Sequence, residues 1–413
     1  MIVHDIAKLI DKSSQIKTED EVFRSFKQEL RKLPKHEDLL LIDRNEVERL
    51  WPLNELECKT VYDLHDALSD HKGKIYYLSA DVNIFKRYEK WLLLNPKVDF
   101  IPLIFPFTFL PKPTIIKDFL FYDETLETEI NLYEEIKKQS KTKNFINLTC
   151  GPKLLRLLLL DKYYQHKNFE YSFYPWYHGK SADFQIMSVI KPLNWFNGQK
   201  IKGKNSNDQI IWYNPSDIGF LNNSAPFREL NEFSSDRNFD ILNKNNFDNF
   251  MPKEVFLSNC DLVIETYLNY DSVLFTEKTF KEIIFRRPFL LLGAKNQNMF
   301  LKKMGFELYD EIFDYEFDIL DTVEQRFNAY CKQIDRYIDL NPETFKNKLL
   351  CIEEKIEHNF QYILREYKKS KIIFDLIRTN YDNEDIFVDD NLLKIQFDEA
   401  MPILKNYESI LND

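Results

Sequence analysis

The first residue that suggests chemistry is a lysine at the start of a predicted helix. Lys278 follows Thr276 and Glu277 and opens a segment whose apolar residues recur at helical spacing. A cation in the first turn opposes the helix dipole, at a cost of about 0.3–1 kcal/mol. An anion bound nearby would explain it, since N–H groups at a helix start bind phosphate. Thr276 is a good N-cap, and Glu277 is placed to pair with ribose hydroxyls. The alternative is that Lys278 points into water.

A second junction repeats this pattern. Residues 144–149 predict a strand, and 153–161 predict a helix whose first turn holds Lys153 and Arg156. In open parallel sheets, ligands bind outside the carboxyl ends of the strands, where both junctions would lie. Solvated surface cations remain the alternative here too.

The first junction belongs to a strand–helix–strand unit. The runs 262–264 and 289–292 are apolar on both faces, as expected for a parallel sheet covered on both sides. Pro288 ends the intervening helix, and Arg286 and Arg287 lie at its C-terminal end, where the dipole favours cations.

Strands and helices alternate along most of the chain, which predicts Rossmann-like parallel sheets. Residues 1–35 predict two helices. Further strands are predicted at 39–42, 74–78 and 98–104, and further helices at 60–69, 83–94, 124–139, 298–304, 323–338, 342–360, 361–378 and 391–411. Gly305 is a predicted C-cap.

These elements predict an α/β protein with two Rossmann-like domains that face a cleft. The first domain is residues 1–135 and the second is 136–380, with a polar insertion near 195–255. A helical tail at 381–413 is expected to cross back to the first domain.

Composition narrows the functional classes. The 413-residue chain has a net charge of −11, which argues against broad nucleic-acid binding, although a local basic groove stays open. Five cysteines without a CxxC pair predict a reduced protein. The start lacks a signal peptide, and the most apolar window, 100–110, is too short to span a membrane. We therefore expect a cytoplasmic location, or the host cytoplasm if the protein is viral.

Several catalytic motifs are missing from the sequence. There is no HExxH, GxSxG, P-loop or GxGxxG pattern, which disfavours zinc proteases, serine hydrolases, P-loop kinases and dehydrogenases. Asp314, Asp318 and Asp321 have a spacing that superficially suggests a metal site, but we interpret them as solvated surface carboxylates.

The segment around Lys278 resembles the donor-binding segment of GT-B glycosyltransferases of the fucosyltransferase type. It also resembles a group of phage and viral glycosyltransferases. The resemblance covers roughly residues 143–360 and is carried by Glu265-Thr266, Thr276-Glu277-Lys278-Thr279, Arg287-Pro288-Phe289, Gly293 and Gly305-Phe306. It implies a GT-B-like fold. No Asp-x-Asp motif of the metal-dependent GT-A type occurs, so no metal and no cofactor are expected.

Two departures weaken any assignment of the sugar. Leu274 stands where the fucosyltransferase pattern has a tyrosine, and Asn269 is one residue out of register with its asparagine. GDP-fucose is therefore not assumed, and the co-substrate is a UDP- or GDP-sugar.

The resemblance implies roles for individual residues. The expected donor-binding residues are Thr276, Glu277, Lys278, Arg156, Lys153, Glu265 and Gly293. A general base for an inverting transfer is expected from the first domain, with Asp81 the best placed, and His65 and Asp43 weaker. A retaining transfer would need no such base.

The predicted function is a metal-independent hexosyl- or pentosyltransferase that uses a nucleotide sugar. The acceptor is a glycan, a protein or a modified DNA base. Two alternatives stay open: a phage-type DNA-base glycosyltransferase, and a non-catalytic GT-B-like binding or structural protein.

Overall fold

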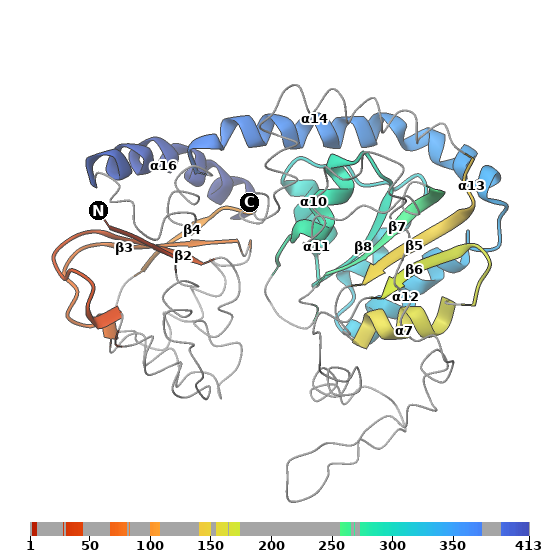
Figure 1. Ribbon diagram of the computed structural model, residues 1–413, viewed down its shortest axis with the longest axis horizontal. Coiled ribbons are helices and arrows are strands. Elements are labelled where there is room, and N and C mark those ends of the chain that lie inside the picture. The colour runs from red at the N-terminus through yellow and green to blue at the C-terminus, as the bar shows by residue number, and fades with distance from the viewer. Residues whose placement is uncertain are drawn as a thin grey trace, which may run out of the picture.

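The computed structural model describes residues 2–5, 28, 30–43, 67–80, 82, 100–107, 140–149, 154–163, 165–173, 257–265, 268, 273–373 and 390–412. The predicted insertion near 195–255 lies outside these ranges, and the predicted domain boundaries stay predictions. Figure 1 shows two groups of strands with long helices beside them.

The N-terminal sheet has four parallel strands among the described residues: β1 (Ile2–Asp5), β2 (Leu39–Asp43), β3 (Ile75–Ser79) and β4 (Phe100–Ile104). Their order in the sheet is also their order in the chain. The three apolar runs predicted as strands are confirmed as β2, β3 and β4. The prediction of helix from the first residue is wrong at β1, because the helical apolar spacing begins only after this short segment.

The C-terminal sheet has the order β6-β5-β7-β8 and is also parallel. Its strands are β5 (Lys143–Thr149), β6 (Phe169–Phe173), β7 (Ser258–Ile264) and β8 (Phe289–Leu292). Every residue of β7 and β8 is buried, as the two apolar runs predict. The chain runs outward from β5 to β6 on one side and from β7 to β8 on the other. The carboxyl ends of β5 and β7 therefore form the switch point where such sheets bind ligands.

The helices follow the predicted alternation in most places. They are α7 (Leu154–Tyr163), α10 (Glu277–Ile284), α11 (Gln297–Lys303), α12 (Val323–Asp335), α13 (Pro342–Leu349), α14 (Glu353–Lys369) and α16 (Asp390–Asn412), with 3-10 turns η6 (Tyr315–Ile319) and η7 (Leu350–Ile352). Gly305 has φ 103°, which confirms it as the residue that ends α11. The predicted break after residue 360 is wrong: α14 runs through it, since no breaker stands there, and the irregular turn is η7. These sheets and helices make the chain an α/β protein with two Rossmann-like parallel sheets.

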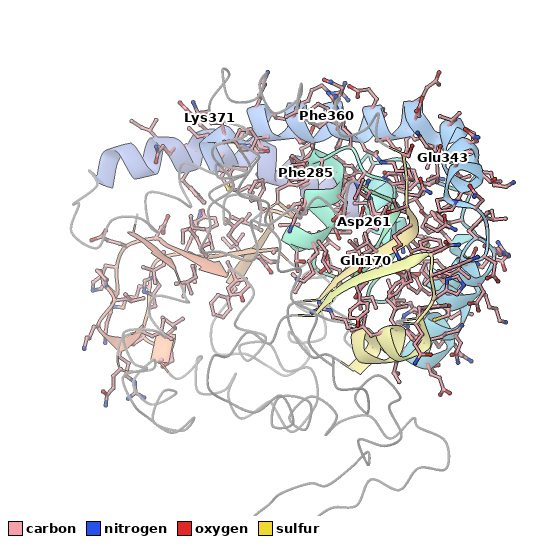
Figure 2. The ribbon with its side chains drawn as sticks, turned by 45° about the vertical axis from the view of Figure 1, so that its right-hand side comes forward. Glu170, Asp261, Phe285, Glu343, Phe360 and Lys371 are labelled. Carbon is pink, nitrogen blue, oxygen red and sulfur yellow. The ribbon has the colours of Figure 1, made fainter. Side chains whose placement is uncertain are left out.

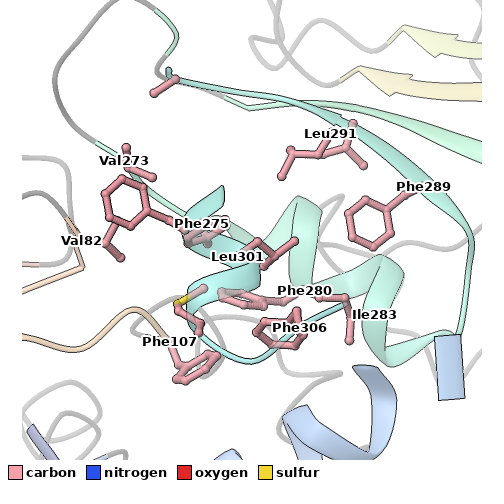
Figure 3. Close-up of a cluster of buried hydrophobic side chains, with 14 of the residues drawn as sticks. Val82, Phe107, Val273, Phe275, Phe280, Ile283, Phe289, Leu291, Leu301 and Phe306 are labelled. Atoms are coloured by element: carbon pink, nitrogen blue, oxygen red, sulfur yellow. The ribbon is translucent and has the colours of Figure 1, made fainter. Parts of the chain in front are cut away.

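An aromatic cluster joins the two sheets. Phe107, which follows β4, packs with ring centroids 5.4 Å from Phe280 of α10, 6.4 Å from Phe306 and 5.7 Å from Tyr407 of α16. Figure 3 shows Phe107 beneath Phe280 and Phe306. Each of these rings is at least 98% buried, so the cluster forms a continuous core between the two halves.

The last helix packs on the N-terminal sheet. α16 contacts β4 and β1, with Tyr407 against Phe105 and Phe397 against Tyr76. In Figure 1, α14 runs across the top of the molecule toward α16. The C-terminal chain therefore covers the first sheet. None of the helices in the part of the chain that the structure describes has the length and apolar character needed to cross a bilayer.

A buried charged cluster lies where α10 meets β7. Arg287 donates from Nε to Asp261 Oδ2 at 2.8 Å, and both side chains are at least 96% buried. Glu282 of α10 is buried beside them, and Figure 2 shows Asp261 inside the C-terminal half. Arg287 therefore does more than complement the helix dipole: it neutralises a strand carboxylate.

Two carboxyl groups share this single guanidinium. Burial, reinforced by the charge of Asp261, raises the pKa of Glu282 well above its usual value. Burial also raises the pKa of Asp261, while Arg287 opposes that shift. We therefore assign the proton to Glu282. Burial, together with the charge of Arg287, lowers the pKa of nearby Lys141 to about 7.

We predict that Glu282→Gln flattens the dependence of stability on pH. Because the folded pKa of Glu282 exceeds the unfolded value of about 4.3, the native state holds the proton more tightly. Its contribution is fully present below the unfolded pKa and is lost as pH rises, with a slope of up to about 1.4 kcal/mol per pH unit. Between pH 5 and 6, Lys141 stays largely protonated in both states, so a difference in slope between wild type and Glu282→Gln over this range belongs to the carboxyl pair.

Urea unfolding of the whole chain across pH 5–6 measures this effect. Wild type should lose stability as pH rises, and Glu282→Gln should lose less. The exposed Glu354→Gln on α14 is the control and should keep the wild-type slope. Identical slopes in all three proteins would contradict the assignment.

Candidate functional site

The site is built on a buried glutamate that follows β7. Glu265 is 1% exposed, and its backbone N–H donates to Leu292 at the end of β8. Its Oε1 accepts from the Thr276 N–H at 3.1 Å and from the Thr279 hydroxyl at 2.6 Å, while Oε2 accepts from the Thr276 hydroxyl at 2.6 Å. Glu265 therefore ties the end of β7 to the first turn of α10.

Thr276 caps α10, as predicted. Its hydroxyl donates to Glu265 and accepts from the Lys278 N–H at 3.4 Å and from Lys278 Nζ at 3.2 Å. A hydroxyl offers one donor and two acceptor lone pairs, so these three contacts use its full capacity. The Thr279 N–H donates to the Thr276 carbonyl. Several donors of the helix start are thus committed within the protein.

Lys278 turns back toward the start of α10. The side chain is half-buried, and its ammonium bonds the Thr276 hydroxyl instead of extending away from the helix. This position is unfavourable with respect to the helix dipole, although the buried Glu265 carboxylate behind Thr276 partly offsets the repulsion. The arrangement holds a cation at the carboxyl edge of the sheet.

Arg156 lies at the same edge. It belongs to α7, which follows β5, and is 4% exposed. Its Nε and Nη2 donate to the Ile264 carbonyl at 3.2 and 2.8 Å, immediately before Glu265. Arg156, Glu265, Thr276 and Lys278 therefore form one continuous set of contacts at the β5–β7 switch point.

Gly293 ends β8 beside a buried glutamine. A Cβ at this position would collide with the side-chain amide of Gln297. Gln297 is held at both ends, since Oε1 accepts from the Ala294 N–H at 2.8 Å and Nε2 donates to the Leu274 carbonyl at 2.7 Å. In the structure, Gly293 makes room for this amide.

The other predicted residues are described in part or not at all. The backbone of Glu277 begins α10. Lys153, Asp81, His65 and Asn269 lie outside the described residues. Asp43 is the last residue of β2.

One predicted surface carboxylate is buried, which corrects the interpretation of the Asp314–Asp321 region. Asp318 is 2% exposed and accepts hydrogen bonds from the backbone N–H groups of Asn298 and Met299, at the start of α11. Burial raises its pKa, against the effect of these hydrogen bonds. Asp318 is therefore a structural cap. Within the described ranges, no group of three or more His, Cys, Asp or Glu side chains is arranged to hold a metal ion.

Sequence reasoning did not single out Thr279 as a partner of Glu265, or Gln297 at all. For Thr279, the only sequence signal is its position three residues after Thr276, which places it on the same side of the helix as the cap. For Gln297 we find no sequence signal, since its two partners are backbone groups, the Ala294 N–H and the Leu274 carbonyl.

Fold and junction together define an α/β protein with a basic strand-to-helix junction at the switch point of a parallel sheet. Comparison of the chain with protein-family models, with curated proteins and with solved structures gave no match. Function must therefore be argued from these residues.

We predict that Glu265→Ala destabilises the protein by about 2–4 kcal/mol, because three buried donors lose their acceptor. Glu265→Gln keeps one carbonyl oxygen and should cost about half as much. Urea unfolding at neutral pH measures both. Glu353→Gln, an exposed first-turn glutamate of α14, is the control and should stay within about 0.5 kcal/mol of wild type. Equal effects of all three variants would show that the junction does not depend on Glu265.

Proposed function

We propose that this protein is a GT-B-like, metal-independent glycosyltransferase that transfers a sugar from a UDP- or GDP-sugar. The observation that carries the proposal is the position of Lys278. Its ammonium is held over the cap of α10 at the carboxyl edge of the sheet. That is where a diphosphate would meet a positive charge at a helix start.

The chemistry needs a cation at this place. Transfer breaks the bond between the anomeric carbon and the diphosphate oxygen and forms a bond to the acceptor oxygen. Negative charge builds up on the departing diphosphate, and a preorganised ammonium stabilises it. In the proposal Lys278 supplies this charge, and Glu277 binds the ribose hydroxyls. We propose that Lys153 and Arg156 add positive charge for the phosphates from the β5 side.

The described contacts change the roles proposed for three residues. Glu265 uses both carboxylate oxygens on α10, so we propose that it acts on the donor through Thr276 and Lys278. Arg156 orients the end of β7 by donating to the Ile264 carbonyl, and we propose that its charge also acts on the phosphates. Gly293 contributes indirectly, because its lack of a side chain leaves space for the Gln297 amide.

The acceptor-side base is proposed to be Asp81. Its sequence neighbours support this choice, because the Val82 N–H donates to Val273 at 3.0 Å and Ala80 packs with Leu274. Both contacts reach the segment that leads into Thr276. No described contact offers comparable support for His65.

We predict that Lys278→Ala weakens binding of UDP or GDP about tenfold or more, since a charge-assisted contact to phosphate is lost. Isothermal titration of the whole chain measures the dissociation constants. Lys302→Ala, an exposed lysine on α11, is the control and should bind like wild type. If wild type binds neither nucleotide, or Lys278→Ala binds as well as wild type, the proposed site is wrong.

We further predict that Asp81→Asn lowers turnover of the donor about 10²–10⁴-fold while nucleotide affinity stays unchanged, as expected for loss of a general base. Release of UDP or GDP from a panel of sugar donors measures turnover, with water as acceptor. His65→Asn is the comparison and should retain activity. The rate should be the same with and without a chelator. Unchanged turnover in Asp81→Asn would remove this residue from the mechanism.

A further inference from the structure

The segment Val273–Thr276, called here the linking segment, lies directly before α10 and contacts the chain that follows β3 of the other sheet. The N–H of Val82, which follows β3, donates to the Val273 carbonyl at 3.0 Å. Ala80 and Leu274 are buried together as a separate apolar pair. Figure 3 shows Val82 beside Val273, with Phe275 two residues further along the chain. The end of β3 thus contacts the chain two to three residues before the cap of α10.

Gln297 fixes the middle of this segment. It is fully buried, and its Nε2 donates to the Leu274 carbonyl at 2.7 Å. Its other end accepts from Ala294 in the turn after β8, where Gly293 leaves space for the side chain. A single amide therefore connects the β8–α11 turn to the linking segment.

We propose that Gln297 is a positioning residue that sets the linking segment and thereby aligns the start of α10 with the end of β3. Its effect on nucleotide binding rests on the proposed function, whereas its effect on the contact between the sheets does not. Without the Gln297 donor, the buried Leu274 carbonyl would lose its partner, and the segment would shift to find another. Val273, which accepts from the Val82 N–H, directly precedes Leu274, and Thr276 follows two residues later, so both contacts would move with the segment.

A matched pair of variants on α11 separates this role from ordinary packing. Gln297→Met keeps the side-chain volume and removes both hydrogen bonds. Asn298→Leu likewise replaces a buried amide by an apolar side chain and removes two hydrogen bonds: Asn298 is 1% exposed, and its Nδ2 donates to Leu291 in β8 and to Asp318. Asn298 bonds no part of the linking segment in the contacts described. Gln297→Glu, which keeps the acceptor for Ala294, replaces Gln297→Met if that variant does not fold.

The first measurement is amide hydrogen exchange at Val82 without ligand. We expect exchange about tenfold faster in Gln297→Met than in Asn298→Leu, after correction for global stability, because only the former releases the linking segment. The second is the affinity for UDP and GDP, which should fall about tenfold in Gln297→Met alone.

Each result has a distinct meaning. Equal Val82 exchange in the two variants overturns the positioning role of Gln297. If the Val82 exchange rates differ between the two variants but their nucleotide affinities are equal, Gln297 does not influence the start of α10. If wild type binds no nucleoside diphosphate but Val82 exchange still separates the variants, the proposed function fails and the positioning role stands.

Discussion

The junction between β7 and α10 depends on how the buried carboxylate of Glu265 obtains its hydrogen bonds. A charged group taken out of water must be fully hydrogen-bonded, and Glu265 obtains its partners only if α10 begins directly beside the end of β7. That requirement places the start of α10 beside β7 and orients Thr276. Once Thr276 is placed, its hydroxyl accepts from Lys278 and holds the ammonium at the sheet edge. The position of the half-buried Lys278 ammonium thus follows from the hydrogen-bonding needs of a buried carboxylate.

Sheet topology adds the second constraint. Because β5 and β7 are neighbours while their following helices depart in opposite directions, the ends of both strands open at one place. Arg156 lies at this place and donates to the Ile264 carbonyl. The linking segment, which contacts the chain directly after β3, leads into Thr276 at the same edge. A ligand at this point would therefore be bordered by residues from both halves of the chain.

The sequence predicted what depends on local pattern and missed what depends on tertiary partners. Apolar runs located β2 and β8, and a threonine before an amphipathic segment located the cap of α10. The strands β1 and β6 were missed, because short mixed-polarity segments gain strand structure only from neighbours in the sheet. Asp318 and Gln297 were beyond prediction for the same reason, since Asp318 accepts from N–H groups at the start of α11 and Gln297 donates to the distant Leu274 carbonyl. Candidate residues were identifiable by type, but their division into ligand-facing and positioning groups required the contacts.

Leu274 shows how the departure from the fucosyltransferase pattern has a structural use. Where that pattern has a tyrosine, this chain has a side chain that is 5% exposed and packs on Ala80, while its carbonyl binds Gln297. A hydroxyl there would need a partner inside an apolar contact between the sheets. The position therefore contributes to alignment of the halves and supplies no polar group to a sugar. In the proposed enzyme, the phosphate end of the donor site is retained, and recognition of the sugar must come from residues elsewhere in the chain.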